Sequence, residues 1–169
     1  MCCAHWDKYL QALSRCAPNY SLQVFAPKWG VGHTQGIKVK LNFQFAHHSH
    51  TESETIKVAT QSDVLKEFDK FDWLDEAKKA SEIQKCAPTF TVIFQDQIEF
   101  MWVSCFLEDA QLRLISECNF PGEVSSLFGL VKKQGVINLH SHSFTLNQTR
   151  EAVGKFLTKD HSALQAMYA

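Results

Sequence analysis

A strict alternation of apolar and polar residues runs through IKVKLNFQF, residues 37–45, and it constrains the fold more than any other stretch. Apolar side chains occupy the odd positions, while the even positions hold Lys38, Lys40, Asn42 and Gln44. Because successive side chains of a strand point to opposite faces, this period of two predicts a strand with one buried face and one wet face. TIKVAT, residues 55–60, is expected to return antiparallel to it, which places HHSHTESE at a hairpin tip in water.

Further strands are predicted in the second half of the chain. TFTVIFQ (residues 89–95), IEFMWVSCFL (residues 98–107) and LRLISEC (residues 112–118) follow one another with short polar turns between them. The middle run is apolar at nearly every position, so we expect a central strand covered on both sides, with Trp102 buried. SLQVFAP (residues 21–27) and VINLHSHSFT (residues 136–145) complete the predicted strands.

Helices are predicted near residues 4–16 and over four later segments. Ser62 is the expected N-cap of SDVLKEFDKF, and WLDEAKKASEIQKC continues with good helix formers. We expect two helices, or one kinked helix, over these two segments. PGEVSSLFGLVKKQG begins with proline and ends with Gly135, which is the usual punctuation of a helix. NQTREAVGKFLTKD is the last predicted helix, followed by a short polar tail.

This order of elements predicts an α+β fold in a single domain spanning residues 1–169. We expect a mostly antiparallel or mixed, twisted sheet of about six or seven strands with helices packed on it. The chain is long enough to bury a hydrophobic core without disulfides or metals.

Composition and charge exclude several classes of function. Lys and Arg total 17 against 18 Asp and Glu, and no block of like charges occurs, so we expect no nucleic-acid partner. No apolar run is long enough for a membrane span, and no cofactor-binding motif is present. The charged N-terminal residues do not resemble a secretory signal, so we expect a cytoplasmic protein with reduced cysteines. Cys105 and Cys118 are expected to be buried, whereas Cys2 and Cys3 should react readily.

Five of the eight histidines fall in two short stretches. His140 and His142 lie two apart in a predicted strand, so their side chains would share a face at a spacing that suits one metal ion. Their stretch, LHSHS, resembles the first metal motif of the polymerase and histidinol phosphatase phosphoesterases and of the amidohydrolase barrels. Too few residues follow His142 to build such a barrel, so the sequence excludes these families. Another zinc site would need a third ligand, for which the candidates are His47, His48 and His50.

The sequence therefore predicts a protein that binds rather than catalyses. We expect a non-enzymatic domain without a cofactor that covers a protein partner, most specifically an immunity protein that neutralises a cognate bacterial toxin. The alternative is a metal-dependent hydrolase that uses the His140 and His142 pair. An exposed aromatic residue beside polar side chains is typical of a recognition surface. The candidate interface residues are Trp29, His33, Lys38, Lys40, Asn42, Gln44, His140 and His142.

Overall fold

The computed structural model describes residues 39–58, 60–94, 98–126 and 131–169. The described residues all belong to Gly36–Ala169, one of the two units into which the chain divides. The helix predicted near residues 4–16 and the strand predicted over residues 21–27 therefore lie outside the described residues. The prediction of a single domain over the whole chain stays a prediction.

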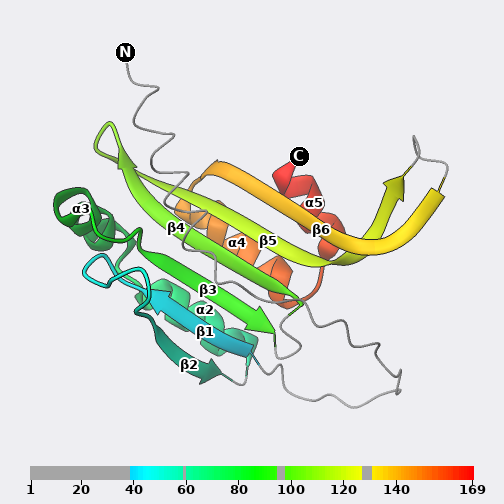
Figure 1. Cartoon of the computed structure of the whole chain (residues 1–169), viewed down its shortest axis with the longest axis horizontal. Helices are drawn as coiled ribbons and strands as arrows, with labels where there is room; N and C mark the ends of the chain where they lie inside the picture. The colour runs from blue at the N-terminus through cyan, green and yellow to red at the C-terminus, as the bar shows by residue number, and fades with distance from the viewer. Residues whose placement is uncertain (1–38, 59, 95–97, 127–130) are drawn as a thin grey trace. The chain divides into compact units, whose positions relative to one another are not determined.

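The described strands form one antiparallel sheet with helices packed on it, which confirms the α+β class. Its order is β2-β1-β3-β4-β5-β6, and every neighbouring pair is antiparallel. The hairpin predicted from the alternation is confirmed, since Leu41 pairs with Ile56. Figure 1 shows the strands side by side in this order. Their bounds are β1 (Val39–Gln44), β2 (Glu54–Val58), β3 (Thr89–Phe94), β4 (Phe100–Glu108), β5 (Gln111–Ser126) and β6 (Val131–Phe144).

Two helices connect β2 to β3, and two more follow β6. They are α2 (Gln61–Lys70), α3 (Trp73–Ile83), α4 (Leu146–Leu157) and α5 (His161–Tyr168). Each begins at a side chain that accepts a hydrogen bond from a backbone N–H three residues later; these caps are Thr60, Asp72, Thr145 and Asp160. The predicted cap at Ser62 is wrong, because Thr60 takes that role. The predicted polar tail is wrong as well, because α5 buries Leu164 completely.

The hydrophobic core lies between the four helices and one face of the sheet. One row of core side chains crosses four strands, because neighbouring strands pair Leu41 with Val92, Val92 with Met101, and Met101 with Cys118. All four of these side chains are fully buried. Helical residues cover this row, among them Phe68, Trp73, Phe156 and Leu164. The same face of β1, β3, β4 and β5 therefore supplies the core, as the period of two predicts.

Aromatic rings make up the part of the core beneath α2 and α3. The ring of Phe90 meets the rings of Phe43 and Phe68 edge to face, at centroid distances of 5.3 and 5.5 Å. Trp73 packs on Phe68 at 4.9 Å, and its indole Nε1–H donates to the carbonyl oxygen of Phe68. Such pairs add roughly 0.5–1.5 kcal/mol each beyond the burial of their area. These contacts fix the junction of α2 and α3 against β1 and β3.

The helix predicted over residues 121–135 is wrong, because β5 continues to Ser126 and β6 begins at Val131. The pairing with β4 ends at Phe100 and Asn119, so the following residues of β5 pair with β6 as a two-stranded arm. Figure 1 shows β5 and β6 continuing together past β4. Pro121 and Gly135 imitate helix punctuation, but long-range pairing with Val136 and Gly122 decides their conformation.

The structure predicts opposite effects of substitution by alanine at two glycines of the described chain. Gly154 lies inside α4, and a Cβ there would meet nothing within 4 Å. Gly154→Ala should therefore raise the free energy of unfolding by about 0.5–1 kcal/mol through helix propensity alone. Gly135 lies in β6, where a Cβ would approach Val124 Cγ2 to 2.6 Å. Gly135→Ala should lower the free energy of unfolding by about 1–3 kcal/mol.

Urea unfolding of the wild type and of both variants measures these changes. Equal destabilisation by the two substitutions would contradict the structure, because it would mean that Gly154 is as crowded as Gly135.

Candidate functional site

The face of the sheet turned away from the four described helices carries a continuous row of polar and aromatic side chains. We call this surface the distal face. The residues paired across the strands in its middle row are Thr55, Asn42, Thr91, Trp102, Glu117 and His140. Side chains of residues directly opposite each other in antiparallel strands lie on the same face, with Cβ atoms about 4.5–5.5 Å apart. The row therefore joins all six strands from β2 to β6.

Trp102 lies on the distal face and is only partly buried, so the prediction that it sits in the core is wrong. Its neighbours Met101 and Val103 point to the helices and are completely buried. The apolar run of β4 therefore does not mean that both faces are covered equally by the core. The indole ring lies 6.3 Å from the imidazole of His140, at an interplanar angle of 64°.

Three polar side chains beside these two rings form a hydrogen-bonded network. Asn138 Nδ2 donates to Glu117 Oε1 at 2.6 Å and to Asn119 Oδ1 at 2.9 Å. Asn119, which is buried, donates from Nδ2 to the same Glu117 oxygen at 3.3 Å. The other carboxylate oxygen, Oε2, lies 3.9 Å from His140 Nδ1. The hydrogen bonds of Asn119 and Asn138 hold the Glu117 carboxylate in one orientation.

Sequence reasoning missed Glu117 and Asn119 as site residues. The alternation in residues 136–140 places Asn138 and His140 on one face, but it does not say which residues of another strand stand opposite. Only the register of β5 and β6, with Asn119 paired to Asn138 and Glu117 paired to His140, assembles the network.

The predicted interface residues of β1 lie at the other side of the distal face. Lys40, Asn42 and Gln44 alternate with buried residues, as predicted, and each is partly buried. Asn42 Nδ2 donates to the hydroxyl oxygens of Ser53 and Thr55. Gln44 Nε2 donates to the carbonyl oxygens of residues 50 and 52. The amides of this group therefore fasten the connection between β1 and β2, while they remain on the same face as Trp102.

The three histidines of this connection differ from one another. His47 and His50 are exposed, as predicted. His48 is buried, contrary to the prediction, because its Nδ1 accepts a hydrogen bond from the backbone N–H of Phe45. Its Nε2 lies 3.9 Å from Glu54 Oε1. His48 thus stabilises the turn that follows β1.

The sheet order separates these histidines from the pair in β6. The strands β3, β4 and β5 lie between β1 and β6, which puts the two groups roughly 19 Å apart at a strand spacing of about 4.8 Å. Zinc ligands must all lie about 2.0–2.2 Å from the ion. The alternative site that combines His140 with His47, His48 or His50 therefore conflicts with the fold. Among the described residues, no group of three His, Cys, Asp or Glu could hold a metal ion.

An irregularity in β6 changes the predicted face of its last residues. Ser141 pairs with Ser116, but Phe144 pairs with Leu114, so β6 holds one extra residue in this interval. As a result Phe144 is buried on the helix side, not on the face of His140 where the alternation places it. His142 lies within the irregular interval, and its side chain is outside the described part of the structure, as are Trp29, His33 and Lys38.

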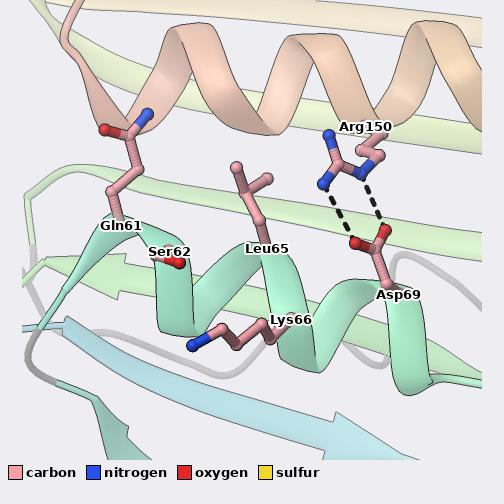
Figure 2. A pocket seen from close by; sticks show the side chains of 6 residues that line it. All are labelled: Gln61, Ser62, Leu65, Lys66, Asp69 and Arg150. Carbon is pink, nitrogen blue, oxygen red and sulfur yellow. Dashed lines mark hydrogen bonds and ion pairs between the residues drawn. The ribbon is translucent and has the colours of Figure 1, made fainter.

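A groove between α2 and α4 is a concave feature near charged groups (Figure 2). Arg150 of α4 donates from Nε and Nη2 to the two carboxylate oxygens of Asp69, at 2.7 and 2.9 Å. The hydrogen bond from Arg150 lowers the pKa of Asp69. Gln61 Nε2 donates to the carbonyl oxygen of Gly154 at the other end. Because these groups form hydrogen bonds between α2 and α4, the groove is the contact that holds the two helices together.

The described cysteines are poorly suited to nucleophilic catalysis. The side chains of Cys86, Cys105 and Cys118 are buried, and Cys105 and Cys118 are free thiols. Burial raises the pKa of Cys105 above its usual range, and burial raises the pKa of Cys118 to about 12. A thiol attacks as the thiolate, so both residues act as small core hydrophobes.

Comparisons with known proteins add no relative on which to base a function. No protein-family model matches the chain, and no curated protein or solved structure is significantly similar to it. None of the helices in the described ranges has both the length and the apolar character that a bilayer crossing needs.

The position of Trp102 predicts that it matters less for stability than a core ring. Phe90 is completely buried, so Phe90→Ala should lower the free energy of unfolding by about 3–5 kcal/mol. Trp102→Ala should lower it clearly less, since part of the ring already meets solvent. Chemical denaturation of both variants tests the order of the two effects, and a larger loss for Trp102→Ala would contradict its place on the distal face.

The buried thiols predict a second measurable property. In the native protein at pH 8, Cys105 and Cys118 should stay unmodified by iodoacetamide, and both should be alkylated in denaturant; peptide mass spectrometry distinguishes the sites. An unfolded cysteine has a pKa of about 8.5, and the folded value of Cys118 is higher. The protonated thiol is therefore favoured in the folded state, and its contribution to stability is fully present below about pH 8.5. The free energy of unfolding should fall as the pH rises from about 8.5 toward 12. Rapid native labelling at either site would contradict this burial.

Proposed function

We propose that this protein is a non-enzymatic binding domain that covers a protein partner with the distal face of its sheet. More specifically, we propose an immunity-type inhibitor, which neutralises a bacterial toxin by occupying its surface. The observation that supports the proposal is the row from Asn42 to His140, in which an indole and an imidazole flank a fixed amide and carboxylate network. Aromatic anchors bordered by hydrogen-bonding groups are typical of protein interfaces.

The shape of the surface favours a large partner over a small molecule. The row crosses six strands, which corresponds to roughly 24 Å at the usual strand spacing. Small ligands are usually enclosed in a concave pocket, whereas a broad sheet face suits another macromolecule. The core on the other side, with completely buried Leu41, Met101 and Phe90, makes the face a rigid platform. A preorganised surface loses little conformational entropy when it binds.

A photo-crosslinking experiment tests the proposal in the cells that naturally make the protein. p-Benzoylphenylalanine replaces Thr91, which is directly opposite Trp102 on the distal face. The matched control carries the same photoreactive residue at Lys66, an exposed position of α2 on the other side of the sheet. We expect one defined crosslinked protein from position 91 and none from position 66.

The substitution Trp102→Ala, combined with the crosslinker at position 91, should reduce the yield at least about tenfold, because truncation of an interface tryptophan commonly costs 2 kcal/mol or more. Mass spectrometry identifies the partner, and coexpression shows whether the wild type suppresses its toxicity while Trp102→Ala does not. Crosslinks that form equally at both positions, or only at position 66, would rule out the distal face as the binding surface. If the crosslinked partner is not toxic, the inhibitory role is refuted, while the binding function of the distal face is not.

A further inference from the structure

Glu117 differs from the other shielded carboxylates of the described chain. Four glutamate side chains that form ion pairs there are less than a third exposed: Glu67, Glu76, Glu99 and Glu117. The first three each have a lysine Nζ within 3.0 Å: Lys70, Lys79 and Lys159. Among the described ion pairs, Glu117 has only His140, at 3.9 Å, which is a cation only when protonated. A carboxylate that is shielded from water is usually paired with a cation. Among the described ion pairs, Glu117 is the one shielded glutamate without a lysine partner.

The surroundings of Glu117 suit a planar cation. Oε1 already accepts hydrogen bonds from Asn119 and Asn138, which keeps the carboxylate in place and directs a further donor to Oε2. Trp102 and His140 are paired with Glu117 in the two neighbouring strands, and their rings lie 6.3 Å apart, so aromatic residues occupy the strand on either side of Glu117. A guanidinium group stacks on such rings and is more weakly hydrated than an ammonium group, so it enters a half-shielded site at lower cost.

We propose that Glu117 is the recognition site for an arginine side chain of the protein partner. This inference rests on the proposed function, and it names the chemistry of the residue that the distal face receives. The guanidinium donates to Glu117 Oε2 and lies against the indole of Trp102, while Asn119 and Asn138 are positioning residues for the carboxylate. The charge of the partner's arginine then neutralises the one shielded glutamate of the set that has no lysine.

The test uses methylguanidinium as the probe and the full-length protein observed by NMR. The indole N–H signal of Trp102, assigned by its loss in Trp102→Phe, and the side-chain amide signals of Asn138 should shift and saturate as the probe is added. Glu117→Gln keeps the size and the acceptor oxygen of the side chain but removes the charge, so binding should weaken about tenfold or more. Methylammonium should bind more weakly than methylguanidinium, because it does not stack on the indole.

The control variant is Glu123→Gln in the arm, where the carboxylate pairs with Lys132 at 3.3 Å and is well exposed. It should bind methylguanidinium as the wild type does, and both glutamine variants should keep the wild-type melting temperature within a few degrees. Equal binding by wild type and Glu117→Gln, or no saturable shift of either reporter, would overturn the cation site.

The two proposals fail separately. Saturable binding of methylguanidinium without any crosslink from position 91 supports a guanidinium site but refutes the protein partner. A specific crosslink from position 91 whose yield is unchanged by Glu117→Gln supports the binding function and refutes the role of Glu117.

Discussion

Burial of one face of the sheet against the helices is the constraint on which the other features of the described structure depend. The strands β1, β3, β4 and β5 contribute apolar side chains on the same side, and α2, α3, α4 and α5 cover them. Fully burying a phenylalanine or leucine contributes about 1.5–3 kcal/mol, and rows of such residues outweigh any local preference of a strand. Because the period of a strand is two, this burial also decides which residues appear on the distal face.

The register between β5 and β6 determines which side chains of the distal face meet in the candidate site. Asn138 and Glu117 are 21 positions apart in the chain, yet their side chains are 2.6 Å apart because their strands pair with one fixed offset. A shift of one residue would turn Asn138 and His140 toward the helices and bring Ile137 and Leu139 out of their packing against the core. The hydrophobic contacts of one face thus determine the polar geometry of the other.

Charged groups within the fold follow a consistent arrangement. Glu76, which is buried, accepts a hydrogen bond from the backbone N–H of Ala46 and binds Lys79, so it fastens α3 to the turn after β1. Glu99, also buried, binds Lys159 in the segment before α5. These carboxylates hold elements of the same chain together. Glu117, by contrast, lies on the face turned away from the helices and accepts its hydrogen bonds from the amides of Asn119 and Asn138.

The sequence by itself determined the class of fold and the local identity of most described elements. Alternation was sufficient for the hairpin of β1 and β2, and apolar runs were sufficient for β3, β4 and the first half of β5. Short-range signals also predicted α2, α3 and α4, because helix propensity and capping act within a few residues. The polar character of Lys40, Asn42 and Gln44 on one face followed from the same period of two.

Only the tertiary structure decided the arm, the bulge and the site. Pro121 and Gly135 satisfy the local rules of a helix, but pairing between β5 and β6 overrides them, because β-structure depends on partners far away in the sequence. The extra residue between Ser141 and Phe144 turns Phe144 into the core, an effect that no periodicity reveals. Trp102 leaves the core for the distal face, and Glu117 meets Asn138, because cross-strand register is set by the global packing of one face and not by any local pattern.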